Sequence, residues 1–472
     1  MTIIFRRLST KAKDKFFNVF SYIFCISFII VGTLVSLNRY WQYEVFYIDF
    51  GQYDQAIWAI SRFQAPMLDH WILGFVPVFA DHFTPSIFLL SPLYWFTSDS
   101  TIILIAQAVA VGLSGLVLYN IGNIVLKDRF ISIAVVSCYY LFVGLQNAVI
   151  TEFHELTIMT LFLTLTFWAS VKKKRFIYFV FLIMTLGFKE ITFLIGICLG
   201  IAIFIIDKKW KKEAIATIIL SVLWGVIALK IIIPYFSPGD YLYTSGIPDT
   251  VSGKLAVLFD HPLKRHTLFY SFFSFGFLPI FAPQFWALMM QDYLSRFATQ
   301  YFSTRWDLGL HYNAVSGVIL ALATIYTLIF FMRYSIVKKY KYIIACLLVG
   351  NALFLNRFVL HGPFNLVYNK AFYDHTKEFE FLNKMVKMVP LNATVATHNN
   401  LASRFTHQRV WLLKDNYENH NPEYILIDNR QGQNPNNFTG SGSLDKILRK
   451  LLKDSNYKII YSTKEQFVFQ RT

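Results

Sequence analysis

The apolar run FFNVFSYIFCISFIIVGTLVSL at residues 16–37, and the stretch YIDFGQYDQAIW at residues 47–58 that follows it, decide how the chain is interpreted. The first is long enough to cross a hydrocarbon core of roughly 30 Å as a helix. Basic residues precede it, so the positive-inside rule predicts a cytoplasmic N-terminus and places the second stretch outside. Asp49 and Asp54 would lose hydration at a bilayer edge, so we expect each to be solvated, paired or used in chemistry.

Composition supports the same interpretation for most of the chain. Of its 472 residues, 55% are hydrophobic, 18% are aromatic and only 15% are charged, and the mean hydropathy is +0.45. Apolar windows of membrane-spanning length recur through the first three quarters, which indicates a multi-pass membrane protein. The net charge is +16, but the basic residues form short runs between these windows, as in cytoplasmic loops, so we expect no nucleic-acid partner. The four cysteines lie in apolar segments and indicate no disulfide or zinc framework.

The apolar windows predict nine clear membrane spans, and two proline-interrupted regions could raise the count to eleven. The spans are 16–37, 101–125, 130–149, 156–171, two short helices within 176–206, 214–233, 314–332 and 342–360. Basic runs flank 176–206 on both sides, which favours a hairpin that turns at Lys189 and Glu190. The alternative is one long span with a buried Lys189–Glu190 pair. An odd count places the C-terminal tail outside the plasma membrane of a prokaryote.

The composition changes from that of a membrane protein to that of a small soluble domain near residue 373. We therefore predict a mainly α fold, with a transmembrane helical bundle over 1–366 and a small extracytoplasmic α/β domain over 372–472. The elements expected in this domain are a helix over 379–389, strands over 394–397, 409–413 and 424–428, a loop over 431–443, a helix over 444–452 and a hairpin over 457–470.

Ionisable residues of the predicted outer loops mostly lie a few positions from a span, so separate loops could converge on one cavity. In such a cavity acids activate a hydroxyl and cations hold a phosphate. We assign catalysis to Asp49, Asp54, Glu152, His154 and Glu155. We assign substrate or phosphate binding to Asp81, His82, Lys189, Glu190, Arg305 and His311.

Most of these residues also have a simpler interpretation. Asp54 could cap the helix that follows it, and Asp69 and His70 are expected to be solvated loop residues. Lys189 and Glu190 could neutralise each other as a structural pair. The cofactor is left open, and a divalent metal ion is one option, because carboxylates and imidazoles bind such ions. Its ligands would be Asp49, Glu152 and His154.

Several short motifs occur in order along the chain. They are IDFGQYDQAIW at 48–58, DHFTPSIFLLSPLYW at 81–95, TEFHELT at 151–157, FKEITFLIG at 188–196, FGFLPIFAP at 275–283, HYNA at 311–314 and NATVATHNNLASRF at 392–405. With these motifs the chain resembles a family of bacterial and archaeal predicted multi-pass membrane proteins related to the GT-C class of glycosyltransferases.

The resemblance implies a GT-C-like membrane glycosyltransferase that transfers a sugar from a polyprenyl-phosphate donor to an acceptor at the outer membrane face. Its partners would be membrane lipid, the lipid-linked sugar and the acceptor. It further implies Asp49 as general base, with Glu152, His154 or Glu155 orienting the acceptor or a metal and Lys189 facing the phosphate. Many GT-C enzymes carry an adjacent acidic pair or a DxD pattern in the first loop, whereas Asp49 and Asp54 are separated.

Two other functions are compatible with the same residues. Broken helices with charges inside the membrane also mark the substrate pathways of transporters and flippases. The membrane part could alternatively be a scaffold that has no catalytic role and presents the C-terminal domain. A transporter predicts a site reachable from both faces of the membrane, whereas an enzyme predicts a groove beside the acids at one face.

Overall fold

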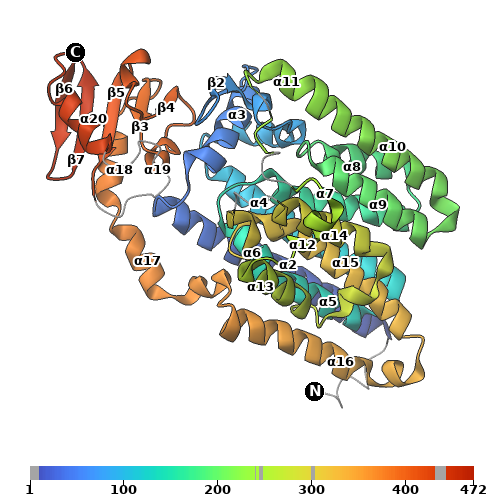
Figure 1. Cartoon of the computed structure of the whole chain (residues 1–472). Coiled ribbons are helices and arrows are strands. Elements are labelled where there is room, and N and C mark those ends of the chain that lie inside the picture. The colour runs from blue at the N-terminus through green and yellow to red at the C-terminus, as the bar shows by residue number, and fades with distance from the viewer. Residues whose placement is uncertain (1–9, 240, 244–247, 299–302, 431–442) are drawn as a thin grey trace.

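The computed structural model describes residues 10–239, 241–243, 248–298, 303–430 and 443–472. Most of the chain forms a helical bundle, and a compact sheet domain lies at one end of it (Figure 1). Part of the basic stretch before the first span and nearly all of the loop predicted at 431–443 lie outside the described residues.

The bundle contains five described helices that are long and apolar enough to cross a membrane. These are Asp14–Trp41, Ile102–Leu126, Lys208–Phe236, Ser303–Phe331 and Ser335–Val359. A sixth candidate is the pair α5 (Arg129–Leu141) and α6 (Val143–Ile150), which is bent by 52°. Three shorter apolar helices, Glu155–Val171, Arg175–Leu186 and Thr192–Ile206, account for the remaining predicted spans. At 1.5 Å per residue these three are about 18 to 26 Å long, shorter than a typical hydrocarbon core.

The hairpin predicted within 176–206 is confirmed, and the alternative of one long span is wrong. Helix α8 (Arg175–Leu186) ends before the turn, and α9 (Thr192–Ile206) begins after it. The turn is held by the 3-10 segment η3 (Pro85–Trp95), because the Ser86 amide donates to the carbonyl of Gly187 at 2.8 Å. This contact places the residues after Gly187 beside the outer loop that precedes η3.

The basic runs of four loops gather at one end of the bundle, where ion pairs join them to one another. The pairs are Asp14–Arg129 at 2.9 Å, Arg175–Glu213 at 2.6 Å, Asp128–Lys341 and Lys173–Asp207. We call this end the basic end. Helix α7 (Glu155–Val171) and α9 both finish at it, so their first residues lie at the opposite end of the bundle.

The predicted C-terminal helices and strands are confirmed as a five-stranded sheet with helices on both faces. The strands are β3 (Val395–Thr397), β4 (Val410–Leu412), β5 (Tyr424–Asp428), β6 (Tyr457–Ser462) and β7 (Gln466–Arg471), in the order β4-β3-β5-β7-β6. Strand β3 is parallel to both β4 and β5, and β7 is antiparallel to β5. Helix α18 (Glu380–Lys387) packs on one face, and α20 (Ser443–Leu451) packs on the other.

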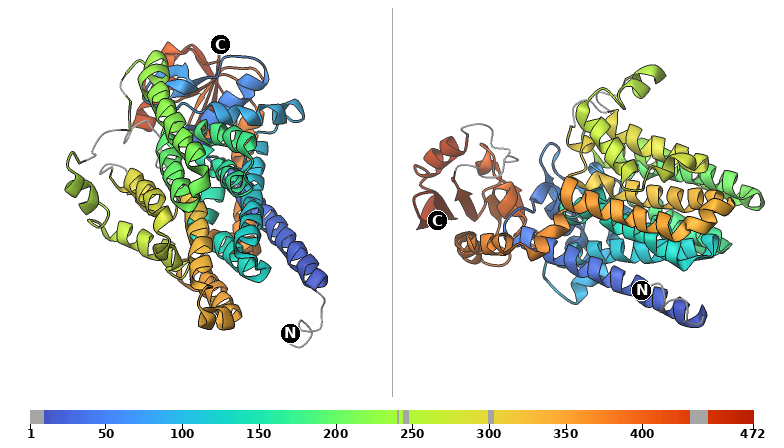
Figure 2. Two further views of the ribbon diagram at one scale, coloured as in Figure 1. Left: turned by 90° about the vertical axis from the view of Figure 1, so that its right-hand side faces the viewer. Right: turned by 90° about the horizontal axis from the view of Figure 1, so that it is seen from below.

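The core on the α18 face includes two aromatic residues from the beginning of the chain, Tyr43 and Tyr47. The segment that follows the first span is therefore packed against the C-terminal sheet. In Figure 2 this blue segment and the red domain lie at the same end of the molecule in both views.

Candidate active site

A cavity of about 440 Å³ lies at the end of the bundle opposite the basic end. Seven residues that the sequence assigned to a site line it, namely Asp49, Asp81, His82, His154, Lys189, Arg305 and His311. They come from loops that are far apart in the chain, as the topology predicts. Glu152, Glu155 and Glu190 are not in the cavity wall, but each contacts a segment that is.

Asp49 lies in a π-helical turn, η1 (Tyr47–Gly51), and is partly exposed where it lines the cavity. Such turns are rare and often occur at functional sites. The turn needs a glycine at position 51, because a Cβ atom on Gly51 would overlap the ring of Tyr47. Among the described residues no hydrogen bond or ion pair to the Asp49 carboxylate is present, so this acid is available to a substrate.

Glu152 and His154 border the same side of the cavity. The Glu152 carboxylate accepts a hydrogen bond from the Phe50 amide at 3.3 Å, and burial together with the nearby charge of Asp49 raises the pKa of Glu152 well above its usual value. Burial lowers the pKa of His154 although two acids oppose the shift, which favours a neutral ring. Gln107 holds the loop from both sides: its amide donates to the Glu152 carbonyl at 2.6 Å and its oxygen accepts from the His154 amide at 2.8 Å.

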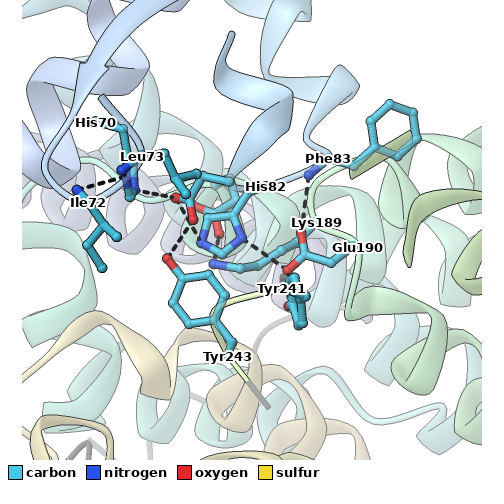
Figure 3. Close-up of polar contacts among 11 residues, drawn as sticks. His70, Ile72, Leu73, His82, Phe83, Lys189, Glu190, Tyr241 and Tyr243 are labelled. Atoms are coloured by element: carbon cyan, nitrogen blue, oxygen red, sulfur yellow. Dashed lines mark hydrogen bonds and ion pairs between the residues drawn. The ribbon is translucent and has the colours of Figure 1, made fainter. Parts of the chain in front are cut away.

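The charged residues of the α8–α9 turn pair with other loops and not with each other. Lys189 donates to Glu155 at 2.7 Å, whereas Glu190 contacts the His82 ring at 3.0 Å and accepts from the Phe83 amide at 3.2 Å. The alternative of a Lys189–Glu190 pair is therefore wrong, because the turn directs these neighbouring side chains to different partners. Figure 3 shows His82 between Glu190 and Tyr243.

His82 is the central residue of an alternating row of acids and bases. Burial disfavours the charged ring, but Asp81 and Glu190 outweigh it and raise the pKa of His82. Burial opposes the charge of Glu190, but His82 together with Lys189 and the Tyr241 hydroxyl outweighs it and lowers the pKa of Glu190. Asp81 also contacts His70 at 3.5 Å, and the pKa of Asp81 is lowered despite burial because both imidazoles lie beside it. These shifts favour a charged His82 ring between ionised Asp81 and Glu190 at mildly acidic pH.

Asp69 and His70, expected to be solvated, are instead buried, with 4% and 1% of their surfaces exposed. Asp69 accepts a hydrogen bond from the backbone amide of Leu412 in β4 at 2.9 Å. The Nδ1 atom of His70 accepts from the amides of Ile72 and Leu73 and so closes the turn of the β1–β2 hairpin (Met67–His70 and Gly74–Pro77). The C-terminal domain covers this loop, which the sequence alone does not reveal.

Tyr241 and Tyr243 are cavity residues that the sequence reasoning missed. The Tyr241 hydroxyl donates to Glu190 at 2.6 Å, and the Tyr243 hydroxyl donates to Asp81 at 2.8 Å. Both belong to a polar outer loop without a helical or strand pattern, so the only available signal was their spacing of two. The guanidinium of Arg305 lies 5.4 Å from the Tyr243 ring centre, which extends the network to the segment before α15 (Ala314–Phe331).

Arg296, on helix α14 (Trp286–Phe297), is a second residue that was missed. It lines the cavity, and its guanidinium donates to the carbonyl of Arg305 at 3.1 Å and to the Asn313 side chain at 2.9 Å. Arg296 thus positions the segment that carries Arg305 and His311. The His311 ring stacks on His154 with ring centres 3.2 Å apart, which brings the segment to the opposite loop.

Asp54 does not line the cavity and does not cap helix α3 (Gln52–Ser61). Its fully buried carboxylate accepts hydrogen bonds from Tyr94 and from Thr406, the latter at 2.5 Å, and lies 3.2 Å from His407. Because Thr406 and His407 belong to the C-terminal domain, these contacts form only when that domain packs on the bundle. Asp54 therefore fastens the C-terminal domain to the loop that carries Asp49.

A second contact holds the other side of this loop. The side chain of Asn399, the first residue of α19 (Asn399–Ala402), accepts a hydrogen bond from the Ile48 amide at 3.0 Å. The C-terminal domain therefore holds the chain directly before Asp49, through Asn399, and shortly after it, through Thr406 and His407.

The residues suggested as metal ligands do not fit a metal ion. In the part of the chain that the structure describes, no three His, Cys, Asp or Glu side chains are arranged to hold one. Glu152 is directed at the Phe50 amide, and the His154 ring is stacked on His311. Asp49 is thus left without the two further ligands that the sequence suggested.

Apolar side chains form another part of the cavity wall. They are Leu156, Ile191, Phe193, Leu194, Ile195 and Val315. Most lie at the start of α9 or just before it, next to Lys189 and Glu190. The cavity therefore offers charged groups and an apolar surface side by side, which suits a ligand with a polar head and a hydrocarbon chain.

A comparison with solved structures finds a similarity to ArnT from Cupriavidus metallidurans bound to undecaprenyl phosphate, with 11% sequence identity and a TM-score of 0.49 over 95% of this chain and 97% of that one. A likeness of this degree carries no inference about the site. No curated protein matches the sequence. The model of the predicted membrane protein family DUF2079 matches residues 39–468, and the chain belongs to that family.

Proposed function

We propose that the protein is a membrane glycosyltransferase that moves a sugar from a polyprenyl-phosphate donor to an acceptor hydroxyl at the outer face of the membrane. The observation that carries this function is the cavity itself. It joins an acid without a partner among the described residues, Asp49, to cationic side chains and an apolar wall. Each of these features corresponds to one part of the reaction: a base, a phosphate site and a place for the prenyl chain.

The chemical step needs only these groups. Asp49 accepts the proton of the acceptor hydroxyl as the hydroxyl oxygen forms a bond to the anomeric carbon. The bond between that carbon and the phosphate oxygen breaks, and its electron pair leaves with the polyprenyl phosphate. Lys189 and Arg305 line the same cavity and stabilise the negative charge that develops on the phosphate.

The other ionised residues act by holding this geometry. Glu155 orients the Lys189 ammonium through their 2.7 Å contact. Burial and the nearby charge of Asp49 raise the pKa of Glu152, which favours its protonated form beside Asp49. Because the charge of Asp49 disfavours a charged Glu152, we assign the base to Asp49 and not to Glu152.

The position of the cavity favours a transferase over a transporter or a flippase. A transporter binds its substrate near the membrane midplane at a site that opens alternately to both sides. The polar residues of this cavity instead come from loops and helix starts at the end of the bundle opposite the basic end. With the basic end in the cytoplasm, as the positive-inside rule predicts, this end faces outward.

Turnover of the purified protein in lipid nanodiscs tests this function. Polyprenyl-phosphate sugars are supplied as donors, cell-envelope lipid and polysaccharide fractions as acceptors, and the release of polyprenyl phosphate is measured. We expect Asp49→Asn to lower the rate by about 10² to 10⁴-fold, the usual contribution of a general base. Asp249→Asn is the matched control, because Asp249 is an exposed acid that does not line the cavity. Unchanged turnover in Asp49→Asn would remove Asp49 as the base.

A further inference from the structure

A second cavity, of about 580 Å³, lies at the basic end between α2 (Thr10–Trp41), α4 (Ile102–Leu126) and α7. Its polar lining includes Asn18, Asn120, Asn123, Arg129, Trp168 and Lys172. Figure 2 shows α2 at the periphery of the bundle, so the cavity is next to the region that lipid occupies. The proposed transfer reaction makes no use of it.

Three asparagines on apolar, membrane-spanning helices need a physical reason, because polar groups in a membrane are costly and usually functional. Two of them are partly satisfied within the protein. The Asn18 side-chain oxygen accepts from the Tyr119 hydroxyl at 3.0 Å, and the Asn120 oxygen accepts from the Trp168 indole at 3.1 Å. The side-chain oxygen of Asn123 is buried and has no partner among the described residues. The three amides make this part of the cavity wall polar within an otherwise apolar bundle.

The two cations of the cavity differ in how their charge is balanced. Arg129 forms an ion pair with Asp14 at 2.9 Å and also bonds to Asn18. Lys172 is exposed and makes no ion pair with a described residue, although its neighbour Lys173 is paired with Asp207. The cavity thus presents one uncompensated positive charge at its rim.

The depth of the cavity matches the boundary between lipid headgroups and acyl chains. Lys172 follows the last residue of α7, and the apolar Leu165 lies seven residues earlier, about 10 Å deeper along the helix axis. Trp168, which also lines the cavity, lies between these two levels on α7. A charged rim, a polar middle and an apolar floor occur in the order of the parts of a phospholipid.

We infer that this cavity binds an anionic phospholipid, such as phosphatidylglycerol. Lys172 attracts the phosphodiester, as basic pockets between membrane helices on the cytoplasmic side do. The asparagine and tryptophan side chains line the level of the glycerol backbone below the phosphate, and the acyl chains contact Leu165 and the apolar residues of α4. Lipid at this cavity joins α2 to α4 and α7, so binding stabilises the bundle.

Lipid titrations of the purified full chain in detergent test the inference. Phosphatidylglycerol, phosphatidylethanolamine and phosphatidylcholine with identical acyl chains are added separately, and bound lipid is counted by native mass spectrometry while the melting temperature is followed. We expect saturable binding and stabilisation with phosphatidylglycerol only. Glycerol phosphate is titrated in parallel, because equal binding of this soluble ligand would overturn the lipid assignment. Equal binding of the three lipids would do the same.

Variants at the cavity complete the test. Lys172→Gln is expected to weaken phosphatidylglycerol binding by about fivefold, the effect of one basic residue at an anionic surface. Lys174→Gln is the matched control, because Lys174 belongs to the same basic run but does not line the cavity. Asn123→Leu is expected to weaken binding of phosphatidylglycerol without changing the melting temperature in lipid-free detergent. If Lys172→Gln and Lys174→Gln bind phosphatidylglycerol equally well, the lipid site is not this cavity. Lys172 is exposed, so this comparison remains valid even if Asn123→Leu fails to fold.

Discussion

The two ends of the helical bundle both carry charged side chains, but they hold them in different surroundings. At the basic end the cation of each pair reaches water: the exposed fraction of its side chain runs from 23% for Lys341 to 71% for Arg175. At the cavity end the acids are buried, with 2% of the Glu155 side chain and none of the Glu190 side chain exposed. Burying a charge is costly, so charges retained at the cavity end indicate a task, whereas those at the basic end serve orientation in the membrane.

The largest effect should come from breaking a buried pair at the cavity end. Lys189→Met removes the partner of Glu155 and leaves a buried carboxylate without its counter-charge, so we expect the free energy of unfolding to fall by about 3 to 5 kcal/mol. Lys173→Met makes the same change at the basic end, where an exposed pair contributes less than about 1 kcal/mol. Unfolding in mixed micelles, followed by circular dichroism, measures both. Similar losses in the two variants would contradict the distinction between the ends.

A smaller effect is expected at the contact between the cavity end and the C-terminal domain. Asp54→Ala leaves the hydroxyls of Tyr94 and Thr406 without their acceptor, which should cost about 1 to 3 kcal/mol. The domain should also become easier to release by limited proteolysis. Asp415→Ala is the control, because the ion pair of Asp415 with Lys446 is exposed at the domain surface. Equal protease resistance of the two variants would show that Asp54 does not fasten the domain.

The smallest effect is a dependence on pH that an exposed ion pair should lack. Because the pKa of His82 is raised in the folded protein, its charged ring stabilises the fold. This contribution is fully present below about pH 6.5, the ordinary pKa of histidine, and is lost as the pH rises through the pKa of His82 in the folded protein. The lowered pKa values of Asp81 and Glu190 give contributions that are present above about pH 4.5 and are lost as pH falls further. The difference in melting temperature between wild type and His82→Gln should therefore be largest between these limits.

His375→Gln provides the comparison for that experiment. His375 pairs with Glu378 at 2.9 Å, but both side chains are about half exposed or more, so water screens the interaction. The melting temperature of this variant should follow wild type across the pH range. A flat profile for His82→Gln as well would mean that His82 is not charged in the folded protein.

Most of the membrane architecture could be predicted from the sequence because it depends on local properties. Segment length and the basic runs on both sides of 176–206 were enough to predict a hairpin, and proline positions predicted the interruption between α13 (Pro262–Phe273) and α14. The convergence of outer loops on one cavity also followed, since each loop lies directly next to a helix. Asp49 and Lys189 were found in this way.

The identity of each partner could not be predicted, because it depends on contacts between distant parts of the chain. Asp54 meets Thr406, which lies 352 positions later, and no local pattern distinguishes it from a helix cap. Lys189 and Glu190 are adjacent in sequence, yet the turn directs them to Glu155 and His82. Tyr241 has no periodic pattern around it, so only the folded chain identifies it as a partner of Glu190.

The contact of Asn399 with Ile48 has a consequence for biosynthesis. The Asp49 loop is made about 350 residues before the segment that holds it, which runs from Asn399 to Leu412. During synthesis the whole helical bundle can therefore be inserted while this loop still lacks its support. A chain that ends before residue 399 would keep the membrane spans but not the held loop, so truncated products should accumulate in the membrane as inactive protein.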